Sequence, residues 1–177
     1  MDFEKIEKII KELLLALNEN PNREGLIDTP KRVAKMYQEL LTPKDIKYTT
    51  FQDNYDDIII VKDIEFTSMC EHHLMPFYGI VHVAYIPNGK IIGLSKIARV
   101  VEKYSKRLQV QERMTNDILN ELKNKLNTDN IAVYIEAKHM CMIARGVKKE
   151  LSKTITVKLN GLFKTEKKAD FYNLINH

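Results

Sequence analysis

The chain has 177 residues, 44% of them hydrophobic, which is enough to bury one ordinary core. Its formal charge of +4 comes from 28 basic and 24 acidic residues, a balance too even to indicate nucleic-acid binding. The N-terminus lacks the regions of a signal peptide, and no apolar run approaches the ~20 residues of a membrane span. We therefore expect a soluble, cytoplasmic protein with no nucleic-acid or membrane partner.

Two helical patterns open the chain. From Phe3 to Leu17 the apolar residues recur at helical spacing, which predicts an amphipathic helix. A second helix is expected after Asp28, where Thr29 can cap it and Pro30 suits the first helical position. These patterns predict an N-terminal helical arm over residues 1–48, followed by a single globular unit over residues 49–177.

Strand patterns follow the arm. Residues 58–67 are rich in Ile and Val and predict a strand that leads directly into Cys70. Residues 79–86 and 90–94 flank an Asn-Gly pair at positions 88–89, which predicts a hairpin between them. The segment around Cys70 is therefore expected to lie between strands.

Two helices and two strands complete the pattern. Ser95 is expected to cap a helix that runs to about Arg107. A second helix has an apolar stripe formed by Met114, Ile118, Leu119, Leu122 and Leu126. Alternation over residues 131–137 and 154–159 predicts two more strands. This order indicates an α+β fold in which an antiparallel sheet carries helices on one face.

Thiol and imidazole groups gather in two short segments. Cys70-Glu71-His72-His73 contains one of only two cysteines and two of the five histidines. The other cysteine, Cys141, lies two residues after His139. Two such segments, far apart in sequence, are typical of a metal site that folding assembles. Zinc is the first hypothesis for the ion.

The number of ligands indicates which kind of zinc site is present. Structural sites use four protein ligands, whereas catalytic sites use three. Cys70, His73 and Cys141 supply three, because positions i and i+3 of a helical turn share a face. His72 then points elsewhere and is free for proton transfer. The alternatives are buried structural Cys and His residues, or a Cys70–Cys141 disulfide, which a cytosolic location disfavours.

With these motifs in view, the chain resembles GTP cyclohydrolase I. The resemblance extends over motifs at residues 23–26, 29–37, 70–73, 84–87, 93–99, 109–113, 139–142 and 145–146. It implies a zinc enzyme that converts GTP to 7,8-dihydroneopterin triphosphate and formate, the first step of pterin and tetrahydrofolate biosynthesis. It also implies a tunnelling fold (T-fold) and a toroidal homodecamer whose active sites lie at subunit interfaces.

The resemblance also assigns roles in the reaction. It implies that Cys70, His73 and Cys141 bind Zn²⁺, in agreement with the set reached from spacing. It implies that His72 transfers the proton needed when water attacks guanine C8. His139 is expected to serve the second hydrolysis, with positioning of a neighbouring group as the alternative. Ser95 is expected to act in the later rearrangement, with helix capping as the alternative.

Substrate contacts are expected from six further positions. Glu112 matches the residue that anchors guanine through its ring NH and 2-amino group, and Gln111 is a plausible secondary contact. Lys96 and Arg99 share a face at the start of a helix, which suits the triphosphate. The resemblance adds Arg145 and Arg32 as phosphate ligands. Without it, each of these charged side chains would be read as an ordinary solvated group.

Three other functions were weighed. Another tunnelling-fold enzyme acting on a pterin or a deazaguanine would have a different ligand set. A zinc nucleoside deaminase would need a Cys-x-x-Cys pair, which this sequence lacks. A zinc-stabilised binding or scaffold protein without turnover would close its site with a fourth ligand. The Cys/His/Cys set with a spare histidine favours the cyclohydrolase.

Overall fold

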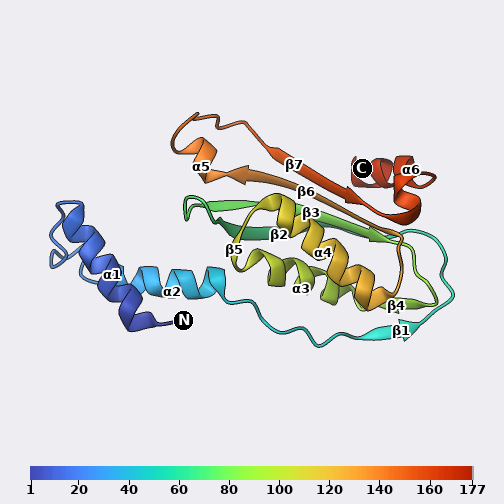
Figure 1. The fold of residues 1–177 in the computed structure, drawn as a ribbon, viewed down its shortest axis with the longest axis horizontal. Coiled ribbons are helices and arrows are strands. Elements are labelled where there is room, and N and C mark those ends of the chain that lie inside the picture. Colours follow the sequence, from blue (N-terminus) through green and yellow to red (C-terminus); the bar gives the residue numbers. More distant parts are fainter. Residues whose placement is uncertain (177) are drawn as a thin grey trace. The chain divides into compact units, whose positions relative to one another are not determined.

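The computed structural model describes residues 1–176 (Figure 1). The chain divides into a unit formed by Met1–Thr42 and a larger unit that starts at Pro43. The first unit contains α1 (Phe3–Ala16) and α2 (Thr29–Leu41), which pack against each other. None of the helices within residues 1–176 combines the length and the apolar character needed to cross a bilayer.

The larger unit is built on strands, and its fold is mixed α+β. In chain order its elements are β1 (Thr50–Gln52), β2 (Ile59–Cys70), β3 (Pro76–Tyr85), β4 (Lys90–Ile92), α3 (Leu94–Ser105), β5 (Leu108–Gln109), α4 (Gln111–Leu126), β6 (Ile131–His139), α5 (Met140–Ile143), β7 (Thr154–Leu159), the 3₁₀ helix η1 (Gly161–Lys164) and α6 (Lys168–Asn176). The helices predicted near residues 3, 29, 95 and 114 are confirmed, as are the strands predicted near residues 58, 131 and 154.

Two predicted helix caps are wrong by one or two positions. At α2 the N-cap residue is Asp28, and Thr29 is already helical. The Asp28 carboxylate forms an ion pair with Arg32 at 3.3 Å and makes no capping bond. At α3 the N-cap is Gly93, so Ser95 lies inside the first turn. In both cases the residue type was suitable, but the helix starts earlier than the periodicity indicated.

The main sheet has the strand order β5-β2-β3-β6-β7. Its pairs are antiparallel except for β5, which runs parallel to β2. The predicted hairpin between residues 79–86 and 90–94 is wrong, because β4 pairs with β1 in a separate two-stranded sheet. The chain does turn at Gly89, whose φ is +73°. However, β2 and β6 already occupy both edges of β3, which leaves no edge for β4.

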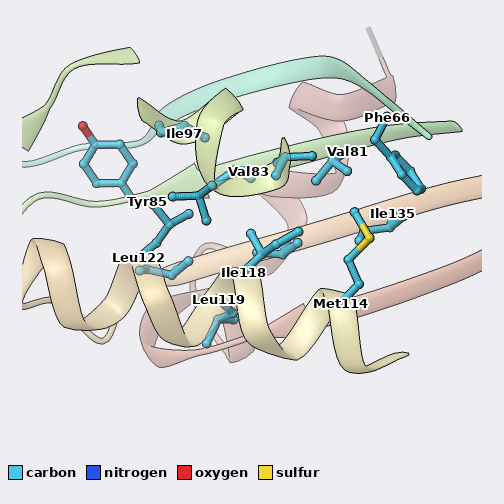
Figure 2. Close-up of a cluster of buried hydrophobic side chains, with 14 of the residues drawn as sticks. Phe66, Val81, Val83, Tyr85, Ile97, Met114, Ile118, Leu119, Leu122 and Ile135 are labelled. Atoms are coloured by element: carbon cyan, nitrogen blue, oxygen red, sulfur yellow. The ribbon is translucent and has the colours of Figure 1, made fainter. Parts of the chain in front are cut away.

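Alternation along β3 divides the core between the two faces of the sheet. Val81, Val83 and Tyr85 face α3 and α4, and each is at most 1% exposed. Figure 2 shows Met114, Ile118 and Leu122 of α4 pointing toward these strand side chains. The stripe predicted from sequence therefore forms the main core.

A smaller apolar cluster covers the opposite face of the sheet. Ala84 and Ala132 pack there with Phe163 of η1 and Phe171 of α6, all fully buried. Figure 1 shows α6 on the side of the sheet opposite α3 and α4. The prediction of helices on one face is thus correct for α3 and α4, but it missed α6. The short C-terminal pattern gave no signal of the second cluster.

A buried histidine closes a bulge on this second face. The β2–β3 register shifts between Val61 and Ile64, and Asp63 adopts a left-handed φ of +58°. The Asp63 N–H donates to Nδ1 of His82 at 3.0 Å, and the His82 ring stacks on Tyr134. Burial lowers the pKa of His82; the Asp63 and Glu136 carboxylates oppose this and Lys62 adds to it. The native bulge therefore requires neutral His82.

Acid should weaken this bulge. The pKa of His82 in the folded protein lies below the ordinary value of about 6.5. The contribution of neutral His82 to stability is therefore complete above about pH 6.5 and is lost as the pH falls from there through the folded pKa. His82→Gln keeps an acceptor for the Asp63 N–H but does not titrate. We expect urea midpoints, measured with a chelator present, to fall more steeply from pH 7.5 to 5 in the wild type than in the variant. Parallel curves would contradict this role.

Candidate functional site

The register of β3 brings the two Cys/His segments together. β2 and β6 both run antiparallel to β3, so both end beside its first residues. Met69 lies opposite Pro76, and His139 lies opposite Phe77. Cys70 ends β2, and Cys141 lies in α5 immediately after β6. Residues some 70 positions apart in sequence thereby meet at one end of the sheet.

The start of α4 reaches the same end of the sheet. Cys70 pairs with Gln109 of β5, and the Glu71 N–H donates to the Gln109 carbonyl at 3.1 Å. α4 begins two residues later, so Gln111 and Glu112 lie in its first turn. The guanine-anchor candidate and the metal-site candidate are therefore held by adjacent backbone.

Cys70, His73 and Cys141 form a three-ligand cluster. Their ligand atoms all lie within 4.8 Å of one another, and Cys70 Sγ is 3.8 Å from Nδ1 of His73. Two ligands of a tetrahedral zinc ion, one sulfur and one nitrogen, lie about 3.6 Å apart. Two thiols and an imidazole are also donors that zinc prefers. The residues present thus fit a metal such as zinc.

The two cysteines are free thiols. Burial, together with the nearby Cys70, raises the pKa of Cys141. Two adjacent thiolates repel each other, and a bound cation would offset that repulsion. The cluster is therefore chemically suited to a cation.

The turn after β2 presents both of its histidines. His72 and His73 are exposed, and their rings meet edge to face at 6.2 Å. His72 Nδ1 lies 4.0 Å from Cys70 Sγ, only slightly farther than the His73 nitrogen. Glu71 forms a two-point ion pair with Arg113, at 2.7 and 3.0 Å. That contact lowers the pKa of Glu71 and links the turn to α4.

Arg145 is held against the cluster. Its Nη1 lies 3.3 Å from Nε2 of His73. A guanidinium only donates, so Nε2 accepts in this arrangement and the neutral ring carries its proton on Nδ1. A metal at Nδ1 would replace that proton and leave the ring proton on Nε2. Metal binding at Nδ1 and this Arg145 contact therefore exclude each other.

His139 is fixed by packing and by one hydrogen bond. Its ring stacks on Phe77 with a centroid distance of 4.7 Å and an interplanar angle of 3°. Nε2 lies 2.8 Å from Oε1 of Gln111, which is 1% exposed. Burial lowers the pKa of His139, and the negative charge of nearby Glu112 opposes that effect. Sequence reasoning did not find this buried contact, because the partners lie 28 residues apart with no spacing signal.

The remaining predicted residues are on α3 or in the N-terminal unit. Ser95, Lys96 and Arg99 are on α3, and Arg99 lines a cavity of about 230 Å³ with Lys44 and Lys103. Within residues 1–176, no ion pair engages Lys96 or Arg99. Arg32 belongs to the N-terminal unit. The structure thus gathers the metal, histidine, Glu112 and Arg145 positions, while those on α2 and α3 stay predictions.

Comparison with known proteins gives a consistent family. The sequence model of the GTP cyclohydrolase I family matches residues 6–176. GTP cyclohydrolase 1 of Streptococcus gordonii is 50% identical, with 99% of this chain and 98% of that protein covered. The enzyme of the same name from Clostridium kluyveri is 51% identical, with 99% and 96% covered. A solved structure, the archaeosine synthase QueF-Like in the apo form, has a TM-score of 0.49 at 19% identity, with 59% of this chain and 93% of that chain covered.

Adjacent histidines allow a matched test of the ligand set. His73→Ala and Cys141→Ala should each lose bound zinc, because each removes one of three donors. His72→Ala should keep one zinc per chain. Zinc is measured by elemental analysis after dialysis, with circular dichroism as the control for folding. Zinc retained by Cys141→Ala, or lost by His72→Ala, would refute the assigned set.

Proposed function

This chain belongs to the GTP cyclohydrolase I family, whose activity it shares, and we propose that it acts at a zinc ion held by Cys70, His73 and Cys141. The convergence of these three ligand atoms within 4.8 Å is the observation that carries the proposal. What zinc supplies there when bound is Lewis-acid activation of water at neutral pH. A set of three protein donors is typical of catalytic rather than structural sites.

The proposed reaction opens the guanine imidazole ring at C8, releases formate and ends in 7,8-dihydroneopterin triphosphate. His72 is proposed to deliver the proton to guanine N7. Its exposed ring lies beside the cluster, 4.0 Å from Cys70 Sγ. An imidazole can both give and take a proton near neutral pH, which ring opening requires.

Two further residues are proposed for the later steps. His139 is proposed to exchange a proton during the hydrolysis that releases formate, because it ends β6 two residues before Cys141. Ser95 is proposed for the rearrangement of the ribose. It is exposed in the first turn of α3, so its hydroxyl is accessible to a substrate.

Guanine recognition is proposed for Glu112. Its carboxylate is exposed in the first turn of α4 and close enough to His139 to affect that pKa. A carboxylate can accept from both the ring NH and the 2-amino group of guanine, whereas adenine offers no such donor pair. Glu112 would thus place the purine beside the histidines.

The triphosphate is proposed to bind cationic side chains. Lys96 and Arg99 lie near the N-terminus of α3, where backbone N–H groups and the helix dipole also favour anions. Arg145 would join them once a metal at His73 Nδ1 displaces its present contact. Arg32 is proposed as a fourth ligand by resemblance alone.

We further propose a tunnelling fold, a toroidal homodecamer with active sites at subunit interfaces, and a cytoplasmic location. The support for assembly is exposed apolar surface. Ile9, Leu13 and Leu17 of the N-terminal unit are 54%, 50% and 62% exposed, which is unfavourable in water without a partner.

Turnover separates the enzyme from a zinc-binding scaffold. Purified zinc-loaded protein incubated with GTP should release formate and form a product with the ultraviolet spectrum of dihydroneopterin triphosphate. His72→Ala should keep its zinc but lose about 10²-fold or more in kcat, because a positioned proton donor contributes that much. No product from zinc-loaded, oligomeric wild type would refute the proposal.

Removing the negative charge of Glu112 tests guanine recognition. Glu112→Gln should raise the KM for GTP about 10- to 100-fold, since a hydrogen bond to a charged group contributes about 1.5–3 kcal/mol. Zinc content should not change. Glu166→Gln, at another exposed glutamate, is the control and should behave as the wild type. An unchanged KM in Glu112→Gln would refute the anchoring role.

A further inference from the structure

We infer that Gln111 is a positioning residue that fixes the tautomer of His139, with the ring proton on Nε2. The inference rests on the proposed function in one respect, namely that His139 takes part in the reaction. The assignment of the ring proton itself rests only on the hydrogen bonds around Gln111.

The orientation of the Gln111 amide is fixed by its surroundings. Nε2 lies 3.2 Å from the Ile135 carbonyl oxygen, 3.0 Å from that of Thr154 and 3.1 Å from Oγ1 of Thr156. Two of these three atoms are carbonyl oxygens, which only accept. An amide turned around would place its own oxygen against both of them in a buried site. The NH₂ group must therefore face them, and Oε1 must face His139.

Two threonines complete the same assignment. Thr115 Oγ1 donates to the backbone carbonyl of Gln111 at 2.8 Å, and its oxygen lies 2.7 Å from Oγ1 of Thr156. Because the Thr115 proton is already used, Thr156 donates to Thr115. Thr156 Oγ1 is then left to accept from the Gln111 amide. Each threonine hydroxyl proton thus has a single acceptor, and this assignment agrees with the orientation of the Gln111 amide.

This orientation determines the tautomer of His139. Oε1 of Gln111 can only accept, and it lies 2.8 Å from Nε2, so Nε2 carries a proton. In the neutral ring Nδ1 is then unprotonated. The parallel stack on Phe77 holds the plane of the ring in which Nε2 meets Oε1. Neutral His139 can therefore accept a proton at Nδ1 but has none to give from that atom.

Gln111 therefore acts on the reaction through His139. An amide oxygen does not take up a proton at neutral pH, so Oε1 keeps the ring proton on Nε2. The unprotonated Nδ1 is the ring nitrogen that this tautomer leaves to the reaction.

Nitrogen NMR tests the tautomer directly. Zinc-loaded protein labelled with ¹⁵N-histidine, compared in the solid state with His139→Asn, identifies the two His139 signals. We expect a protonated Nε2 and an unprotonated Nδ1 at pH 8. The reverse assignment, or a mixture of tautomers in the wild type, would overturn the inference. This measurement needs no turnover, whereas failure of the proposed function would show separately as no product from GTP.

Two substitutions separate positioning from packing. Gln111→Met and Gln111→Glu both remove the NH₂ donors, but only Glu keeps an acceptor for Nε2–H. We expect mixed tautomers in Gln111→Met and a protonated Nε2 in Gln111→Glu. We also expect kcat of Gln111→Met to fall about 10²-fold with the KM for GTP within about twofold. A retained tautomer in Gln111→Met would overturn the inference, as would a loss expressed only in KM, which would indicate direct contact with GTP.

Discussion

The placement of β3 between β2 and β6 is the constraint on which the site depends. Since β2 and β6 both run antiparallel to β3, the last residues of both strands lie beside the first residues of β3. Cys70 and His139 therefore lie at the same end of the sheet. Gly79 lies within this register, and a Cβ there would come within 1.9 Å of the Glu136 carbonyl oxygen. A side chain at this position would separate β3 from β6 close to the site. Strand pairing thus brings Cys141 to the local pair Cys70 and His73.

The site has a buried half and an exposed half, and they suit different tasks. Gln111, Phe77 and His139 are held by the sheet and by α4, where hydrogen bonds leave one arrangement of protons. His72 and His73 lie in a turn whose next residue, Leu74, has a φ of +51°, and both are open to solvent. The fixed geometry suits His139, whose proposed role depends on which ring nitrogen carries the proton. The accessibility suits His72 and His73, which are proposed to meet the substrate and the metal.

The sequence predicted what periodicity and residue chemistry encode. The stripe on α4 was predictable because an amphipathic helix must bury one face, and the Cys/His/Cys set because few side chains bind soft cations. The supposed hairpin at residues 87–89 failed because turn chemistry is local, whereas the partner of β4 depends on edges already occupied by β2 and β6. The contacts of Gln111 lie 24 to 45 residues away, so no spacing rule could reveal them.

Glu71 shows how a weak interaction can matter in this arrangement. Its ion pair with Arg113 joins side chains that are 30% and 48% exposed, and such surface pairs add little to stability. Its position is more significant than its energy. Glu71 lies between the proposed zinc ligand Cys70 and the proposed proton donor His72, while Arg113 follows Glu112 on α4. Together with the backbone bond from Glu71 to Gln109, the pair ties the turn that carries the proposed metal ligands to the helix that carries the proposed guanine anchor. This connection therefore fixes how far the turn lies from the start of α4, and stability measurements alone would not reveal it.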